Sequence, residues 1–211
     1  MEIIWMGHSC FRIRGKEAII ITDPFEKALG YPMRKLTASI VTVSHGHPSH
    51  SFTDGIDGNP RIIRRPGEYE ISNVFINGIA TFHDSEKGEK LGENIVYVIQ
   101  IEDVRICHLG DLGHKPDTEQ IEQMSNVDVL MIPVGGGSTI GTSAAVETIS
   151  LLQPKVVLPM HFKTEAVSRD LAPLEPFLKE MGLIETTSQP KLTISKSTLP
   201  AETSVTVLDY K

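Results

Sequence analysis

Cysteine is scarce in this chain, and long apolar runs are absent. Its 211 residues include two cysteines, Cys10 and Cys107, which lie far apart and form no Cys-x-x-Cys pair. This usage is typical of reduced core thiols in a cytoplasmic protein rather than of a disulfide framework. No stretch approaches the roughly 18 apolar residues of a membrane-spanning helix, and residues 1–5 lack the basic start of a secretion signal. We therefore expect neither secretion nor a membrane span.

Positive charge is limited as well. Lysine and arginine number 20 against 27 acidic residues, which gives a net charge of -7 without any basic run. This balance argues against nucleic acid as a partner, because phosphate contacts need clustered basic residues. A local patch at Arg61, Arg64 and Arg65 could face an anionic substrate, although a solvated turn is the simpler interpretation. With 40% hydrophobic residues, the chain can bury one sizeable core, and we predict a single domain over residues 1–211.

Two motifs of other hydrolase classes are missing. Residues 136–143 have the outline Gly-x-x-x-x-Gly-Thr-Ser, but Thr142 stands where a phosphate-binding loop needs lysine. This segment is better interpreted as a glycine-rich turn that lines a pocket. The sequence also has no Gly-x-Ser-x-Gly elbow, so the serines near histidine do not indicate a serine hydrolase.

The first half of the sequence predicts strands and turns. Short apolar or alternating runs at residues 2–6, 10–14 and 18–22 are typical of a β-meander. Further strands are predicted at residues 40–43, 61–63, 74–79, 95–101 and 104–107. The last two would be joined by a tight hairpin turn at Glu102 and Asp103.

Helices alternate with strands in the second half. The predicted helices are residues 118–124 after the capping candidate Asp117, residues 144–152 after Thr142 and Ser143, and residues 171–181. The predicted strands are residues 128–132, 156–158 and 205–208. A strand-rich half followed by this alternation predicts two packed sheets with helices outside, an α/β sandwich.

The most informative segment holds three of the eight histidines. His45, His47 and His50 fall within six residues, directly after the predicted buried strand 40–43. Neutral imidazole is a common ligand of transition metals. Gly46 and Pro48 break any long helix here, so the preceding strand would hold this loop at a sheet edge. The segment therefore indicates a metal site.

Polar residues or glycines also follow four other predicted strands. These positions are His83 with Asp84, Gly110 with Asp111, the three glycines 135–137, and His161. Loops held on a rigid sheet edge are where binding and catalytic sites are built. We therefore expect these positions to lie near the histidine loop.

These residues resemble the metallo-β-lactamase fold superfamily, whose usual motif is His-x-His-x-Asp-His followed by a distant His, Asp and His. The chain is most similar to the branch that includes L-ascorbate 6-phosphate lactonase and many zinc-dependent hydrolases. Besides the histidine loop, the resemblance rests on Gly7-His8-Ser9, Thr22-Asp23-Pro24, Pro66-Gly67-Glu68-Tyr69-Glu70, Leu109-Gly110-Asp111-Leu112-Gly113-His114 and Pro159-Met160-His161. It runs the whole length and implies a four-layer αβ/βα sandwich, with two mixed β-sheets flanked by helices.

The resemblance also implies a set of metal ligands and a function. It assigns His45, His47 and His83 to one metal. His50 and His161 would bind a second, and Asp111 would bridge both. Zinc is the expected metal, and manganese or iron would suit the same nitrogen and oxygen ligands. The implied activity is metal-dependent hydrolysis, by an activated water, of a small-molecule ester, lactone or phosphodiester.

The roles of the residues around these ligands stay open. We predict Asp111 and His114 as the catalytic residues. Asp23, Asp84, His8 and His114 would support the ligands or face the substrate, since ligating imidazoles usually donate their other N–H to a carboxylate or carbonyl. For each of these four, an ordinary turn or surface role is an equal alternative.

The chain departs from the family motif at Ser49, which stands where the motif has aspartate. A neutral hydroxyl is a poor metal ligand, and Asp111 is then the one carboxylate in the assigned set. We therefore expect a tight site at His45, His47 and His83, and a second site that is weak or absent. An alternative function is a catalytically weakened protein that binds a metal or metabolite as a sensor or partner subunit. A homo-oligomer is compatible with either function.

Overall fold

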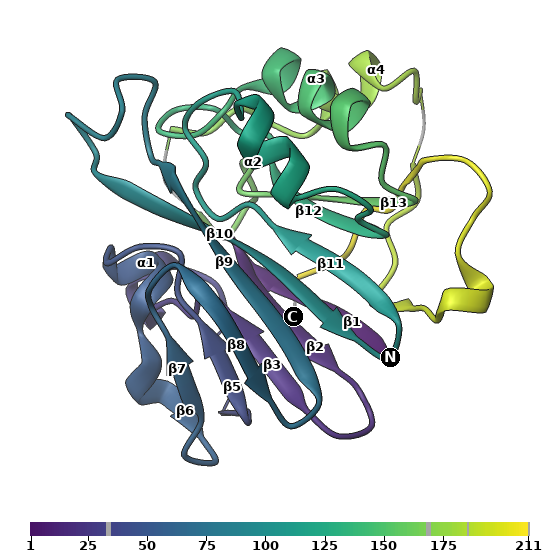
Figure 1. The fold of residues 1–211 in the computed structure, drawn as a ribbon. Coiled ribbons are helices and arrows are strands. Elements are labelled where there is room, and N and C mark those ends of the chain that lie inside the picture. Colours follow the sequence, from purple (N-terminus) through teal and green to yellow (C-terminus); the bar gives the residue numbers. More distant parts are fainter. Residues whose placement is uncertain (33–34, 168–169, 185, 211) are drawn as a thin grey trace.

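The computed structural model describes residues 1–32, 35–167, 170–184 and 186–210 (Figure 1). Its first sheet has the order β14 (Leu192–Thr193), β1 (Glu2–Gly7), β2 (Cys10–Arg14), β3 (Ile19–Thr22), β5 (Ile40–Thr42), β7 (Arg61–Ile63). The second has the order β15 (Ser204–Val205), β13 (Val156–Met160), β12 (Val129–Pro133), β11 (Val104–His108), β10 (Glu93–Ile101), β9 (Val74–Phe82), β8 (Gly67–Ile71). A two-stranded sheet pairs β4 (Leu36–Thr37) with β6 (Ile56–Asp57).

Helices cover the outer face of the second sheet. These are α2 (Thr118–Gln123), α3 (Thr142–Leu152) and α4 (Glu175–Glu180), which lie together on one side of the molecule in Figure 1. On the side of the first sheet the helical elements are short: η1 (Lys27–Leu29), α1 (Pro48–Ser51) and η2 (Thr53–Gly55). A further short element, η3 (Lys196–Thr198), comes late in the sequence. The predicted sandwich of two mixed sheets flanked by helices is confirmed.

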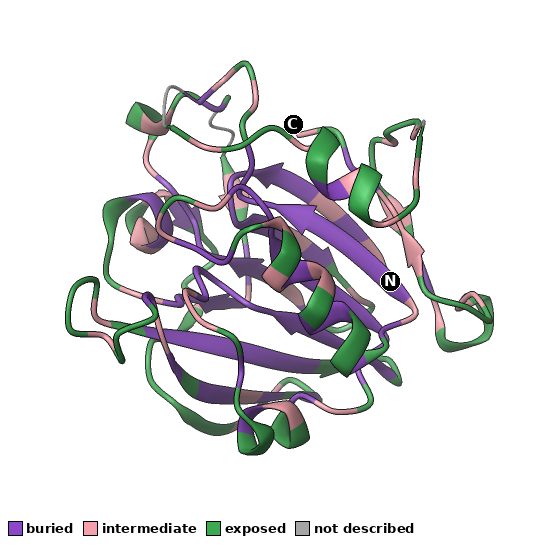
Figure 2. Ribbon diagram, turned by 90° about the horizontal axis from the view of Figure 1, so that it is seen from above, coloured by how far each residue is buried: buried purple, intermediate pink, exposed green. Residues whose placement is uncertain are grey.

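The main core lies between the two sheets. Ile20 and Ile40 of the first sheet pack there with strands of the second, whereas their neighbours Ile21 and Val41 pack into a smaller cluster on the opposite face with Phe25. Strands buried on both faces carry continuous apolar runs, which explains the sequence of β3 and β5. Figure 2 shows this burial of the strands, with the helices exposing one face. In the described part of the chain, no helix has both the length and the apolar character to cross a membrane.

Most predicted strands are confirmed, and so is the hairpin between β10 and β11. Glu102 and Asp103 have φ angles of 50° and 63°, as a tight turn between twisted strands requires. Asp117 caps α2 through its side chain, as predicted. The edge strand β8 was not predicted, because its alternating Glu-Tyr-Glu sequence exposes one face and lacks an apolar run.

Several predicted elements have different bounds in the structure, and β9, for example, continues to Phe82 instead of ending at residue 79. The predicted helix 171–181 begins only at Glu175, because Pro173 disfavours helical backbone before it and Pro176 is tolerated only in a first turn. Helix α3 begins at Thr142 with Gly141 as its cap, two residues earlier than predicted. The predicted strand 205–208 is reduced to β15, and Leu208 instead bridges to Gln189.

Strand direction determines where the loops meet. In the first sheet β1, β3, β5 and β7 run the same way, because β1 and β3 both pair antiparallel with β2 while β3, β5 and β7 are parallel. In the second sheet β9, β11, β12 and β13 share one direction by the same reasoning. The segments that follow these strands therefore gather at one edge of each sheet.

Candidate metal centre

The predicted site residues come from this common edge. From the first sheet, His8 follows β1, Asp23 follows β3 and His45 to His50 follow β5; from the second, His83 follows β9, Asp111 follows β11 and His161 follows β13. Residues more than 100 positions apart in sequence thus meet where the two sheets face each other. The expectation that polar strand ends lie near the histidine loop is confirmed.

Asp111 lies at the centre of the group. Its Oδ2 atom is 3.2 Å from Nε2 of His50 and 3.3 Å from Nε2 of His161. The same oxygen is 3.4 Å from Nε2 of His83 and 4.0 Å from Nε2 of His45. Burial alone would raise the pKa of Asp111, but the imidazoles of His161 and His50 hold it well below its ordinary value. A buried anionic carboxylate therefore faces four imidazoles.

Hydrogen bonds on the far side of three rings fix their orientation. Nδ1 of His50 donates to Oδ2 of Asp23 at 2.9 Å, and Nδ1 of His83 donates to the carbonyl oxygen of Ser138 at 3.0 Å. Nδ1 of His45 lies 3.0 Å from Oγ of Ser44, whose own proton goes to Asp23. Such partners would leave Nε2 free to bind a metal once each ring is neutral.

Asp23 is a buried charge that supports this arrangement. It lies directly after β3 with a φ angle of 40°, a left-handed backbone conformation that residues other than glycine seldom adopt. Its Oδ1 accepts the main-chain N–H of Ser44 at 2.7 Å, and its Oδ2 accepts the Ser44 hydroxyl at 2.6 Å. Although burial opposes ionisation, the hydrogen bond from His50 lowers the pKa of Asp23. Asp23 is therefore not a surface residue, and its predicted support of a metal ligand through His50 stays a prediction.

In the metal-free protein, the pKa values of His50 and His45 are shifted in opposite directions. Burial opposes the charged form of His50, yet Asp111 and Asp23 raise its pKa to about 9. Burial, together with the charge on His50, lowers the pKa of His45 to about 4. Bringing a cation here would therefore displace a proton, as metal binding to imidazole requires.

The residues present fit a metal ion. Two groups have all their ligand atoms within 4.8 Å of one another: His45, His83 and Asp111, and His8, His50 and His161. Nε2 of His45, His50 and His161 is buried and faces Asp111, yet it forms no well-directed hydrogen bond with any described residue. Buried polar atoms are rarely left so, and imidazole with carboxylate is a donor set for zinc, manganese or iron.

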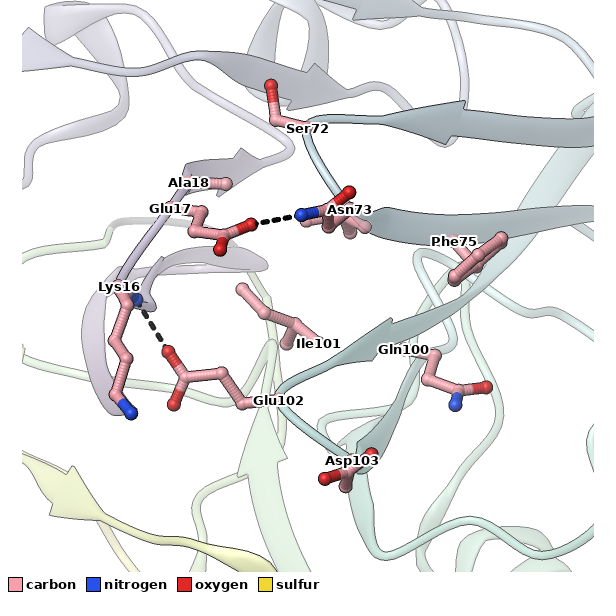
Figure 3. A pocket seen from close by; sticks show the side chains of 11 residues that line it. Lys16, Glu17, Ala18, Ser72, Asn73, Phe75, Gln100, Ile101, Glu102 and Asp103 are labelled. Carbon is pink, nitrogen blue, oxygen red and sulfur yellow. Dashed lines mark hydrogen bonds between the residues drawn. The ribbon is translucent and has the colours of Figure 1, made fainter.

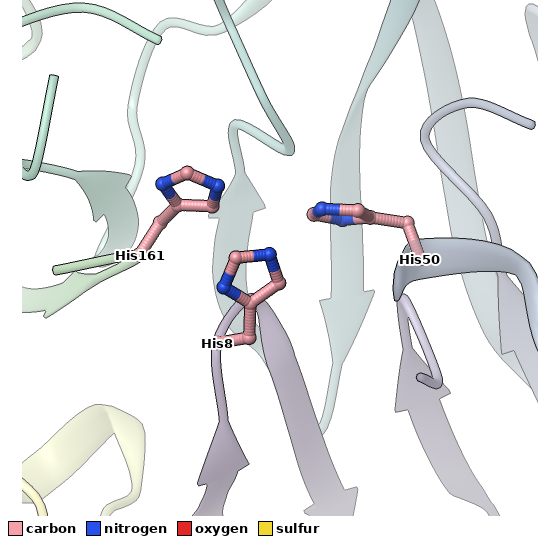
Figure 4. A group of neighbouring side chains, drawn as sticks. All are labelled: His8, His50 and His161. Atoms are coloured by element: carbon pink, nitrogen blue, oxygen red, sulfur yellow. The ribbon is translucent and has the colours of Figure 1, made fainter. Parts of the chain in front are cut away.

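His8 is the unexpected member of these groups. Figure 4 shows its ring beside those of His50 and His161, which come from different loops. The ring centroid of His8 lies 4.2 Å from that of His161 and 4.8 Å from that of His50. The sequence left His8 between a supporting role and an ordinary turn, and the structure places it fully buried inside the site.

His47 lies outside both groups. It is exposed at the N-cap of α1, where its Nδ1 accepts the main-chain N–H of Ser49 at 3.2 Å and lies 2.7 Å from Oγ of Ser49. Ser49 thus directs its hydroxyl to His47. Metal binding by His47 stays a prediction.

Asp84 and His114 have structural partners. The Asp84 carboxylate accepts main-chain N–H bonds from Glu86, Gly88, Lys90 and Leu91, which lower its pKa to about 2. Nε2 of His114 accepts the N–H of Phe82, and Nδ1 donates to the carbonyl of Lys115. These bonds fix the chain on both sides of His83. A catalytic role for His114 stays a prediction.

Asn94 is a supporting residue that the sequence analysis did not identify. It is fully buried in β10, and its Oδ1 accepts the main-chain N–H of Asp111 at 2.9 Å. Its amide donates to the carbonyl of Leu109 and to the Thr81 hydroxyl. The sequence signal that could have identified Asn94 is its position as a polar residue directly before the apolar run 95–99.

A cavity of about 540 Å³ adjoins the centre. His45 and His83 line it together with Arg64 and Leu91. Its volume is in the range of small-molecule pockets. A second hollow of about 260 Å³ lies at the opposite ends of the strands, among hairpin turns joined by contacts such as Glu17 to Asn73 (Figure 3). None of the described residues that line that hollow is a histidine.

Comparison with known proteins agrees with this geometry. Residues 2–161 match the model of the β-lactamase superfamily domain. A protein named UPF0173 metal-dependent hydrolase from Thermoplasma volcanium is 32% identical over 193 residues, covering 78% of this chain and 84% of that protein. A crystal structure from Thermotoga maritima, of a protein assigned to the zinc-dependent hydrolases of the metallo-β-lactamase superfamily, is 39% identical. The alignment covers 100% of this chain and 99% of that chain, with a TM-score of 0.83.

A more distant structure shares the fold alone. Isothiocyanate hydrolase from Delia radicum gut bacteria has a TM-score of 0.71 at 13% identity, over 92% of this chain and 99% of that one. The family match and the two nearer relatives carry the assignment. The chain belongs to the metallo-β-lactamase superfamily and is a metal-dependent hydrolase.

Proposed function

We propose that the chain hydrolyses a small ester, lactone or phosphodiester at the centre around Asp111. One observation carries this proposal: a single carboxylate oxygen lies 3.2 to 4.0 Å from Nε2 of four histidines, beside a cavity of about 540 Å³. A carboxylate so placed can be shared between two cations. Sites of this kind act on esters and phosphodiesters without a protein nucleophile.

Zinc is the proposed metal, with manganese or iron as alternatives. His45, His83 and Asp111 would hold the tighter ion, and the predicted contribution of His47 requires its ring to leave Ser49. When bound, the metal supplies Lewis acidity that makes a water molecule acidic near neutral pH and polarises the substrate. Ser138 and Asp23 keep the rings of His83 and His50 oriented toward that position.

The cavity favours a substrate with an anionic part and an apolar part. Arg64 lines it, and its guanidinium donates to Oγ1 of Thr53, which holds it at the rim. Leu91 is 49% exposed and lines the same cavity. A guanidinium binds phosphate or carboxylate in a bidentate manner, and Leu91 can cover an apolar group. A small phosphorylated or lactone-like ester has this chemistry.

A cytoplasmic location is part of the proposal. Cys10 and Cys107 are free and buried, and burial raises the pKa of both thiols. Buried thiols of this kind are unreactive and need no oxidising compartment.

The test compares the zinc-loaded protein, the chelated protein and Asp111→Asn on phosphodiesters, lactones and thioesters. Turnover by the loaded native protein alone is the expected result. Asp103→Asn is the matched control, since Asp103 lies in the distant hairpin turn at φ 63°, a conformation that asparagine tolerates. If the loaded protein cleaves no substrate, the proposal fails, and the alternative of a weakened binding protein replaces it.

A further inference from the structure

We propose that His8 is a metal ligand, which with His50 and His161 forms a second site in place of the carboxylate that Ser49 lacks. The inference rests on the proposed function, because it names the ligands of the second metal in the same centre. It assigns a coordination role to a residue outside the histidine loop. Two of these imidazoles, His50 and His161, already lie 3.2 and 3.3 Å from Oδ2 of Asp111.

The backbone holds His8 in a defined position. Strand register shifts between Trp5 and Gly7, and His8 follows at φ 52°. Its carbonyl oxygen accepts Nε1–H of Trp5 at 2.9 Å and the main-chain N–H of His161 at 3.1 Å. His161 is itself at φ 53°. His8 and His161 thus both have strained, left-handed backbone and are joined by a main-chain hydrogen bond. Backbone strain of this kind is concentrated at functional sites.

The ring geometry suits a shared ion. The ligand atoms of His8, His50 and His161 all lie within 4.8 Å of one another (Figure 4). Tetrahedral zinc with bonds of about 2.0–2.1 Å places its nitrogens roughly 3.3 Å apart, so no pair would have to close by more than about 1.5 Å. Small side-chain rotations supply such a shift.

The surroundings of His8 differ from those of a structural histidine. His108 shows the structural case: it is fully buried, its Nε2 donates to the carbonyl of Ser9 at 2.7 Å, and its ring packs against Phe11. The ring of His8 packs against the imidazoles of His50 and His161, whose Nε2 atoms face Asp111 without forming a well-directed hydrogen bond in the described part of the chain. A cation shared by the three rings would satisfy those atoms.

The charge of the site predicts its strength and selectivity. An imidazole at His8 restores the number of ligands but not the negative charge that Ser49 removes. The second site is therefore weaker than the first. Imidazole ligands suit zinc, whereas manganese prefers sites richer in oxygen. The second ion is lost first on dialysis, and zinc is retained better than manganese.

Zinc content per chain tests the proposal without any substrate. Protein is equilibrated by dialysis against a buffer with a fixed concentration of free zinc, and the zinc that it holds above the level of that buffer is measured by mass spectrometry. The native protein should hold about two zinc ions and His8→Ala about one, because three ligands plus a shared group complete a zinc site. His8→Ala combined with Ser49→Asp should regain the second ion. His108→Gln, a matched loss of a buried imidazole, should keep both.

Cobalt spectra give a second readout, since loss of a nitrogen ligand changes the visible absorption of the second ion. The proposal is overturned if His8→Ala keeps both ions, if the native protein holds only one, or if the double variant does not recover. Equal loss in His108→Gln would also overturn it. A native protein that binds no zinc would instead refute the proposed function, which makes the two failures distinguishable.

Discussion

Asp23 and His50 share a hydrogen bond of 2.9 Å that joins two loops of the metal centre. Both side chains are fully buried, and the bond runs from Nδ1 of the ring to Oδ2 of the carboxylate. It turns Nε2 of His50 toward Asp111, 3.2 Å away. The orientation of a proposed ligand thus depends on a residue that is not itself part of either ligand group.

Replacing Asp23 with asparagine should weaken zinc binding by about 10- to 100-fold. The amide can turn its NH₂ group toward His50, which would move the ring proton to Nε2 and block that atom. Competition with a coloured chelator measures the change, with Asp103→Asn as the control. An unchanged zinc affinity would show that Asp23 does not orient the ligand.

Replacing Ser49 with aspartate should raise the affinity of the second zinc and leave that of the first nearly unchanged. The new carboxylate offsets cation charge that Asp111 alone balances poorly. Calorimetric titration resolves the two binding steps. Two sites of equal affinity in the native protein would refute the predicted imbalance. A gain of hydrolysis in the variant would show that serine impairs catalysis, and a loss that the site is tuned around it.

Replacing Asp84 with asparagine should loosen the loop 84–92 in a pH-dependent way. The carboxylate accepts four main-chain N–H bonds, and an amide keeps only one acceptor oxygen for them. These bonds lower the pKa of Asp84 from 3.8 to about 2, so the stabilisation is complete above the higher value and disappears as pH falls through the lower one.

Thermal unfolding of both proteins between pH 2 and pH 7 measures this effect. The difference in melting temperature should be constant above about pH 5 and shrink as the carboxylate of the native protein becomes protonated. A difference that persists at the lowest pH would mean that the carboxylate charge is not what holds the loop.

Replacing Arg64 with alanine should raise KM for anionic substrates about tenfold or more, since hydrogen bonds to charged groups contribute about 1.5–3 kcal/mol. The value of kcat should change little, because Arg64 lines the cavity but is not one of the candidate ligands. Steady-state kinetics on an anionic ester and a neutral lactone separate the effects. An equal change for both substrates would exclude charge recognition.

Much of the candidate site was predictable because its residues directly follow apolar runs that the sequence identifies as strands. His83, Asp111 and His161 each follow an apolar strand, and parallel strands bring their carboxyl ends to one edge. The family resemblance then grouped these residues with the histidine loop. The edge strand β8 was not predicted, because its alternating glutamates leave no apolar run. The start of α4 was predicted too early, because prolines delay the beginning of this helix.

The remaining residues depend on tertiary packing that no local pattern encodes. Gly7-His8-Ser9 has the sequence of a turn, and only the register shift of β1 and the contact with His161 bury its histidine. His47 is the opposite case. Its spacing matches the ligand motif, yet the short helix α1 uses its ring as a cap.

Anomalous diffraction at the zinc absorption edge from zinc-loaded crystals tests the central claim most directly. We predict a strong peak about 2.0–2.2 Å from a carboxylate oxygen of Asp111 and close to Nε2 of His45 and His83, with a weaker peak near His8, His50 and His161. Zinc found only at surface residues, with no peak beside Asp111, would contradict the assignment of this centre as the metal site.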